Sequence, residues 1–399
     1  MNRSRTAASI ALGAGIVVLA LALRSGIGSL GVVLPEVRDA LDFSPAGISV
    51  LTTLAPLCFA LVGLGTGRLI LRFGVHRVTV VLLAAVALGL LGRSLTGSWV
   101  VFLLATVAAM AGAAVGNVVL PPLAKRHFPH RVATISALYG AAVVGGGSLA
   151  SALTVPVGDA VGGWRVGLGI WAAVAAVGLL MWLPTAFGDD LPVTDPTPGR
   201  RLTLGDVGRT RVGLAMAACF GFQSSQAYVQ FGWWGAMLTD AGADAAHAGL
   251  LLALVTGMSV PVTLSLPALI RLTGGGIALP VLFSACTVTG WVGLLVAPLA
   301  GDGWPWAALL GLGSGAFTWV LAMIAARSRT PEGTSQLSAL TQGTGYLLAS
   351  ATTFSAGLLR DATGSWSVSI AVTAVLAVGI GVTGAVVARS GPVEDQLAR

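Results

Sequence analysis

The chain has 399 residues, of which 55% are hydrophobic and 9% are charged, whereas about 25% of the residues of a typical soluble domain are charged. Such a chain cannot cover a water-facing surface, which excludes soluble enzymes, disordered proteins and nucleic-acid-binding proteins. The formal net charge of +7 is therefore attributed to basic loops beside a membrane rather than to a nucleic-acid partner.

Apolar stretches of about 20 residues, separated by short polar breaks, recur along the chain and are typical of membrane-spanning helices. The first stretch is too long for a signal sequence and has no small-residue cleavage site, so we expect it to stay in the protein. In chain order we predict twelve spans, at residues 8–35, 46–67, 76–94, 99–124, 132–156, 164–187, 211–239, 246–270, 277–299, 304–326, 335–359 and 366–388.

Basic residues decide the predicted orientation of these spans. With the N-terminus inside, 17 of the 22 basic residues fall on the cytoplasmic side and four fall outside, which is a strong positive-inside bias. Both termini are therefore predicted to be cytoplasmic. The four outer residues include Arg93, at the end of the third span. The remaining one, Arg24, lies near the middle of the first span, and no Asp or Glu is expected at that depth.

The segment 188–210 is the longest hydrophilic stretch and is predicted to be a cytoplasmic linker. It separates an N-terminal six-helix bundle at 1–187 from a C-terminal six-helix bundle at 211–399. The two halves share short motifs at an offset of 200 to 202 residues; for example, Leu69-Ile70 matches Leu269-Ile270. Several matches at nearly the same offset indicate a parallel repeat.

The loop after the second span reads GRLILRFGVHR at residues 67–77. It resembles the signature loop G-x-L-x-D-R-x-G-R of the major facilitator superfamily, with Leu71 in place of the aspartate. Together with the parallel repeat, this resemblance implies an all-α membrane protein of twelve transmembrane helices, arranged as two six-helix bundles. It also implies a loop that acts in conformational change, formed by Gly67, Arg68, Arg72, Gly74 and Arg77.

Several further stretches resemble the narrower cyanate/nitroimidazole transporter family of that superfamily. They are GNVVLP at 116–121 running into KRHFP at 125–129, FQS at 222–224, GYLLA at 345–349 and GLLRDATGSW at 357–366. The chain departs from that family's pattern at Trp234-Gly235 and at Thr353-Phe354. The resemblance implies a multi-pass protein of the bacterial cytoplasmic (inner) membrane.

Arg24 is the main candidate for binding substrate. An arginine stays protonated in a protein, and a charge at the bilayer centre costs at least about 2.5–3.5 kcal/mol on insertion scales. The planar guanidinium donates two parallel hydrogen bonds to groups such as carboxylates. We therefore expect Arg24 to hold an anionic or nitro-bearing substrate in a water-filled cavity. The alternative is a structural arginine that reaches outward or is held by carbonyl groups.

The seventh span carries Gln223, Gln226 and Gln230 at spacings that place them on one helical face. The repeat offset puts the counterpart of Arg24 in the same cluster, so we expect at least one of these amides to line the cavity. The alternative is hydrogen bonding between helices. Tyr228 lies about 140° round an ideal helix from Gln223, so both face the cavity only if this helix is broken.

The chain has three tyrosines, all placed away from the expected membrane interfaces. On the eleventh span Ser338, Gln342 and Tyr346 form a stripe at i, i+4 and i+8. The resemblance places helices 1, 4, 7 and 10 and helices 2, 5, 8 and 11 around the cavity. The expected substrate-binding residues are Arg24, Asn117, Tyr139, Gln223, Gln226, Tyr228, Trp319, Gln342 and Tyr346.

No other chemistry is indicated by the sequence. His76, His127 and His130 fall in predicted cytoplasmic loops, where we expect solvated side chains. The three cysteines have no metal-ligand spacing, and no nucleotide-binding loop or intramembrane acid–base pair is found. We therefore expect no metal, no cofactor and no enzymatic activity.

These features predict a secondary active transporter that works as a monomer by alternating access. Its substrate is expected to be a small planar anion or a nitro- or carboxylate-bearing organic compound, such as a cyanate-like ion. The runner-up is a multidrug-type exporter of neutral or weakly charged compounds such as nitroimidazoles, with Arg24 structural. A membrane receptor is the alternative from another class, and the short linker speaks against it. The expected partners are a small-molecule substrate and the lipid bilayer, with no nucleic acid.

Overall fold

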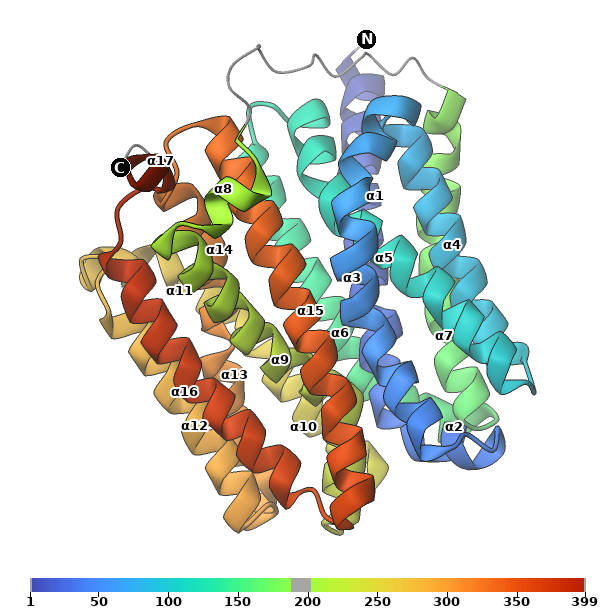
Figure 1. Ribbon diagram of the computed structural model, residues 1–399. Coiled ribbons are helices and arrows are strands. Elements are labelled where there is room, and N and C mark those ends of the chain that lie inside the picture. Colours follow the sequence, from blue (N-terminus) through green and yellow to red (C-terminus); the bar gives the residue numbers. More distant parts are fainter. Residues whose placement is uncertain (1, 188–201, 398–399) are drawn as a thin grey trace. The chain divides into compact units, whose positions relative to one another are not determined.

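The computed structural model describes residues 2–187 and 202–397, which are almost entirely helical and contain no strand (Figure 1). Contacts within the chain divide it into two units, residues 1–194 with 244–253 and residues 195–243 with 254–399. This division differs from the predicted one because the start of the eighth span groups with the first unit. The predicted linker lies outside the described residues as far as residue 201, and its end forms the short helix α8 (Leu204–Gly208).

Unit 1 is built mainly from the first seven α-helices. The turns between them follow from local sequence: Ser44 accepts a hydrogen bond from the amide of Gly47 at the start of α3, and Gly74, with φ of 83°, makes the sharp turn into α4. The helices are α1 (Asn2–Val32), α2 (Leu34–Ala40), α3 (Pro45–Phe73), α4 (Val75–Leu95), α5 (Trp99–His127), α6 (Val132–Val161) and α7 (Trp164–Trp182), followed by the 3-10 turn η1 (Leu183–Phe187).

Small residues bring α1 close to its neighbours in unit 1. A Cβ at Gly28 would lie 2.5 Å from the carbonyl oxygen of Gly147 on α6, and a Cβ at Gly146 would meet the backbone of Leu21. On α5, Gly116 packs in the same way against the Leu23 side chain. Helices in membranes associate through such small-residue contacts, so α1 is fixed between α5 and α6.

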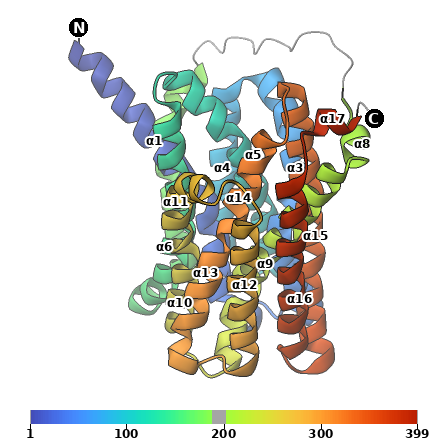
Figure 2. The ribbon, with the colours of Figure 1, turned by 90° about the vertical axis from the view of Figure 1, so that its left-hand side faces the viewer.

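Unit 2 contains the remaining helices, apart from the start of α10. The threonines that cap α9 and α15 accept hydrogen bonds from the third amide of each helix, and Gly221 on α9 packs against Gly345 on α15. The helices are α9 (Arg211–Asp240), α10 (Ala245–Gly257), α11 (Ser259–Leu272), α12 (Ala278–Val296), the 3-10 turn η2 (Ala300–Gly303), α13 (Trp304–Gly313), α14 (Gly315–Ala326), α15 (Pro331–Thr363), α16 (Ser367–Arg389) and α17 (Val393–Leu397). Figure 2 shows α12 and α16 running alongside each other, as their contacts require.

The last helix, α17, fastens one end of unit 2. The carboxylate of Glu394 accepts hydrogen bonds from the amides of Arg329 and Thr330, both at 3.0 Å, and from the Thr330 hydroxyl at 2.9 Å. Desolvation alone would raise the pKa of Glu394, but these hydrogen bonds outweigh it and hold the pKa below its ordinary value. Gln396 also accepts from the amide of Val212, so α17 ties the starts of α9 and α15 together.

Two expected spans are interrupted, and neither is the seventh. The eighth span divides at Met258, three residues before Pro261. Pro261 has no N–H to donate to the carbonyl of Gly257, and its ring would collide with that carbonyl in a straight helix. The tenth span divides at Ser314, between two glycines. In contrast, α9 runs unbroken for 30 residues, so the break considered for the seventh span does not occur.

All twelve predicted stretches form helices. Ten helical segments in the described part of the chain are long and apolar enough to cross a membrane by length and composition. The other two, α9 and α15, have 30 and 33 residues and carry more polar side chains. The proposed site residues Gln223, Gln226 and Gln342 are among these polar side chains.

Candidate substrate-binding site

Arg24 lies on the side of α1 that faces away from α4 and α7. At 100° per residue, Gly26 and Gly15 are about 200° and 180° round the helix from Arg24. Gly26 packs against side chains of α4 and α5, and Gly15 accepts a hydrogen bond from the Trp182 indole of α7. Leu23 and Leu21, both close to Arg24 in sequence, contact α5 and α6. Arg24 therefore projects between α5 and α6, and it is partly exposed.

The structural arginine of this unit is Arg93, which the sequence placed in an outer loop position. Arg93 is fully buried on α4, donating one hydrogen bond of 2.8 Å to the carbonyl of Gly26 and one of 2.7 Å to the Ser29 hydroxyl. It holds α4 to α1 by carbonyl and hydroxyl contacts, the role considered as the alternative for Arg24. Only the position of Arg93 at the end of the third span was visible in the sequence, and its contacts with α1 were not.

Two further predicted residues of unit 1, Asn117 and Tyr139, lie at different heights along the axis of α1. Asn117 follows Gly116, which contacts the residue preceding Arg24, so α5 brings Asn117 to the level of Arg24. Tyr139 lies on the α1-facing side of α6, but seven residues, or about 10 Å, before the contact of Gly146 with Leu21. Both side chains are partly exposed. Unit 1 thus brings Asn117, and not Tyr139, to the level of Arg24.

Unit 2 brings two predicted tyrosines together in an aromatic cluster. The rings of Tyr228 on α9 and Tyr346 on α15 are 5.9 Å apart and nearly perpendicular. Phe220 lies edge-on to Tyr346 at 5.0 Å and 5.6 Å from Phe317 on α14. Edge-to-face pairs of this kind are favourable for aromatic rings. The cluster places Tyr228 and Tyr346 on the side of α9 that is shared by α14 and α15.

The glutamines of α9 have different surroundings. Gln226 is engaged at both ends of its amide: it accepts a hydrogen bond of 2.6 Å from the Trp291 indole and donates to the carbonyls of Phe222 and Thr373. The bonds to Trp291 on α12 and Thr373 on α16 are interhelical, as in the alternative to cavity lining, whereas the bond to Phe222 lies within α9. Gln223 is also buried, but its Oε1 has no hydrogen-bond partner among the described residues. Because α9 is continuous, Gln223 and Tyr228 lie on different faces.

The remaining predicted residues of unit 2 lie on α14 and α15. Trp319 is fully buried on α14 and packs toward Gly384 of α16; its indole nitrogen has no hydrogen-bond partner in the described ranges. Gln342 donates a hydrogen bond of 2.8 Å to Ser338 along the predicted stripe of α15. Trp319 therefore occupies the interior of the helix packing, beside α16.

The loop between α3 and α4 carries the predicted conformational motif. Gly67, Arg68, Arg72 and Arg77 are exposed, and Gly74 provides the turn with its positive φ. The Arg72 guanidinium lies 5.2 Å from the ring centre of Phe73, which is a local cation–π contact. The three arginine side chains of this loop are therefore at the surface of unit 1, and the role of the loop in conformational change stays a prediction.

Two histidines expected to be solvated are instead paired. The Nε2 atoms of His76 and His127, at the adjoining ends of α4 and α5, are 2.9 Å apart, and both rings pack near Trp182. His76 is buried. The expectation was wrong because the two histidines are 51 residues apart in sequence, and their contact forms only when the helices pack.

Outside the membrane-spanning segments, burial and the nearby carboxylates of Asp159 and Asp39 raise the pKa of Glu36.

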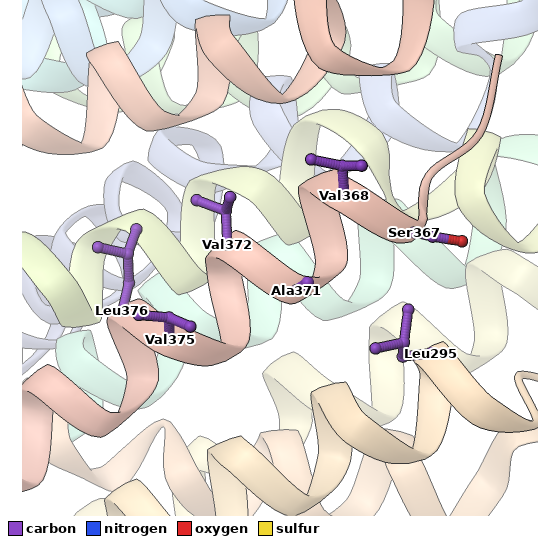
Figure 3. Close-up of a pocket in the computed structure, with 7 residues that line it drawn as sticks. All are labelled: Leu295, Ser367, Val368, Ala371, Val372, Val375 and Leu376. Carbon is purple, nitrogen blue, oxygen red and sulfur yellow. The ribbon is translucent and has the colours of Figure 1, made fainter. Parts of the chain in front are cut away.

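An apolar groove on α16 and α12 is unsuited to an anion (Figure 3). Apart from one hydroxyl, its lining is aliphatic, so it offers no group that would orient a charged ligand. Its valines are among the exposed apolar side chains of α16, a surface suited to lipid. The lining residues are Leu295, Ser367, Val368, Ala371, Val372, Val375 and Leu376.

The sequence model of the Major Facilitator Superfamily matches residues 15–353. The chain belongs to this superfamily. It is a multi-pass membrane protein, and its family and relatives are transporters. No group of three or more His, Cys, Asp or Glu within the described residues is arranged to hold a metal ion.

Relatives and solved structures agree with this assignment. The chain is 30% identical to the 2-nitroimidazole transporter of Escherichia coli (strain K12) over 377 residues, covering 94% of each protein. It is 27% identical to the cyanate transport protein CynX of the same organism over 370 residues, covering 92% of this chain and 94% of CynX. The crystal structure of the nucleoside transporter NupG shares the fold with a TM-score of 0.73 at 12% identity, covering 96% of this chain and 99% of NupG.

Proposed function

We propose that this transporter moves a small planar anion, or a nitro- or carboxylate-bearing organic compound, by alternating access, and that Arg24 binds the charged group. We also propose that it acts as a monomer in the bacterial cytoplasmic membrane with both termini inside. The observation that carries the proposal is the contrast between two arginines. Arg93 is fully buried and holds α4 to α1, whereas Arg24 is partly exposed near the middle of the apolar span of α1.

The chemistry of Arg24 supports an anionic or planar oxygen-bearing ligand. Its guanidinium is a permanent charge with a planar set of donors that matches carboxylate geometry. Asn117, at the same level of unit 1, adds an uncharged amide that can donate and accept hydrogen bonds. The relative that transports cyanate is consistent with this substrate class.

A second candidate function is export of neutral or weakly charged compounds such as nitroimidazoles. It is favoured by the relative that transports 2-nitroimidazole and by the aromatic pair of Tyr228 and Tyr346, since aromatic side chains commonly line pockets for flat organic ligands. In that case Arg24 would be structural.

Ligand-induced thermal stabilisation of the purified protein distinguishes the two functions. A ligand that binds only the folded state raises its stability by about 2.7 kcal/mol at one hundred times its Kd. The panel contains cyanate, nitrate, formate, acetate and neutral 2-nitroimidazole. The variants are Arg24→Gln, Arg24→Lys and, as a matched control for the loss of one positive charge, Arg38→Gln in the exposed part of α2.

The proposal predicts that one class of anion stabilises the wild type and Arg38→Gln but not Arg24→Gln. Loss of a hydrogen bond to a charged group costs about 1.5–3 kcal/mol, or roughly a ten- to hundredfold loss of affinity. Arg24→Lys should retain part of the affinity because it keeps the charge but loses the planar donors. Stabilisation by 2-nitroimidazole alone, unchanged in Arg24→Gln, would instead favour the second candidate function. Counterflow in proteoliposomes then tests movement of the compound that binds.

A further inference from the structure

Arg93 is a buried charge whose role is only partly explained by packing. Both terminal nitrogens donate to neutral groups of α1, the Gly26 carbonyl and the Ser29 hydroxyl. Its Nε is buried without a hydrogen-bond partner, and no Asp or Glu forms an ion pair with it in the part of the chain that the structure describes. Both acceptors are neutral, so neither of them offsets the charge of Arg93.

A charge in this position is costly. An ion removed from water loses its hydration, and it is normally paired with an opposite charge or neutralised. An arginine keeps its proton, so Arg93 adds a full positive charge to the interior of unit 1. That charge is uncompensated by any ion pair within the described ranges, and it therefore acts on other groups in the unit.

The geometry of α1 places this charge behind Arg24. Gly26 and Ser29 lie two and five residues beyond Arg24, about 3–8 Å along the helix axis, and on the opposite side of a helix that is about 10–12 Å wide. From these dimensions, an anion bound by the outward-pointing guanidinium of Arg24 would lie roughly 16 Å from the Arg93 guanidinium. At an effective dielectric constant of about 20, two unit charges at that distance attract by about 1 kcal/mol, which is about a sixfold change in affinity.

We propose that Arg93 raises the affinity of the Arg24 site for anions over neutral ligands without contacting the ligand. The inference rests on the proposed function, because it needs a charged ligand at Arg24. Arg93 is thus a positioning residue with two effects: it holds α1 against α4, and it supplies a second positive charge on the far side of α1. The second effect depends on the ligand's charge, and the first does not.

The first test measures the Kd of cyanate and of neutral 2-nitroimidazole by titration calorimetry for the wild type, Arg93→Gln and Arg93→Lys. We expect Arg93→Gln to weaken cyanate binding about sixfold and to leave 2-nitroimidazole binding within about twofold, as the Coulomb attraction predicts. Arg93→Lys should resemble the wild type because the charge remains. Equal losses for both ligands in Arg93→Gln, or no loss for cyanate, would overturn the inference.

A second pair of variants avoids removing Arg93. Ser29→Asp places a carboxylate next to the Arg93 guanidinium, which now lies 2.7 Å from the serine hydroxyl, and so cancels its charge. Ser29→Asn is the matched neutral control of similar size. Cyanate affinity should fall several-fold in Ser29→Asp relative to Ser29→Asn, and equal affinities would refute the inference even where Arg93→Gln does not fold.

Failure of the proposed function gives a different result. If cyanate binds Arg24→Gln as tightly as it binds the wild type, Arg24 is not the anion site and both proposals fail. If Arg24→Gln abolishes cyanate binding while Ser29→Asp and Ser29→Asn bind equally, the proposed function stands and only the role of Arg93 is refuted.

Discussion

Replacing Gln226 by methionine tests whether this amide is structural. The change keeps the length of the side chain and removes three hydrogen bonds, including the 2.6 Å bond from the fully buried Trp291 indole. A buried donor left without a partner costs about 1–3 kcal/mol, whereas hydrogen bonds between membrane helices average about 0.6 kcal/mol. We therefore expect a loss of about 1–2 kcal/mol, a fall of roughly 2–8 °C in Tm for a unit of this size.

The matched control is Gln230→Met, one turn along α9. Gln230 is also buried, and its side chain makes no hydrogen bond within the described residues, so its replacement leaves no donor or acceptor without its partner and should not lower the stability. Both variants should bind cyanate with wild-type affinity, measured by calorimetry after thermal unfolding has ranked their stability. If Gln226→Met is as stable as Gln230→Met but loses cyanate binding, Gln226 contacts substrate and our structural assignment is wrong.

Three further predictions concern packing and pH. Gly28→Ala would place a methyl group 2.5 Å from a carbonyl oxygen of α6, so we expect at least about 2 kcal/mol of destabilisation, seen as a lower Tm or a lower yield of monodisperse protein. Glu394→Gln should lower Tm at neutral pH. Because the pKa of Glu394 is lower in the folded state, the carboxylate stabilises the protein above pH 4.5, the ordinary pKa of a glutamate. The difference in Tm from the wild type should therefore shrink as the pH falls below that value. A difference that is constant with pH would show that the carboxylate charge is unimportant. The Nε2 atoms of His76 and His127 lie 2.9 Å apart, and a hydrogen bond between them needs one unprotonated nitrogen, so two protonated rings would repel each other. Acidification from about pH 7 to about pH 5 should therefore destabilise the wild type more than His127→Phe, and equal pH profiles in differential scanning fluorimetry would contradict this.

The superfamily signature and the apolar stretches were readable from the sequence because both are local. Hydrophobic length alone determines that a segment of about 20 apolar residues forms a helix in a membrane. Arg24 could be singled out in the same way, since a lone charge inside an apolar run is visible without knowing its neighbours. Tyr228 and Tyr346 were both among the expected substrate-binding residues, but their contact was not predicted and is visible only in the structure.

The partners of buried polar groups required the tertiary structure. Helical periodicity shows which residues share a face, but it does not show which helix that face meets. Gln226 therefore looked equivalent to Gln223 until Trp291, 65 residues away, was seen to bind it. In the same way, the sequence shows Arg93 only as an outer residue at the end of a predicted span, and not that its side chain is fully buried against α1.

The sequence by itself determined that the chain is a helical membrane protein of the major facilitator type and that Arg24 is its unusual charge. Only the tertiary structure decided that Arg93 is the arginine held by carbonyl and hydroxyl groups, that Gln226 joins helices, and that His76 and His127 are a pair. The physical reason is that hydropathy depends on each residue's own side chain, whereas burial and hydrogen bonding depend on residues that are distant in sequence and adjacent only after the helices pack.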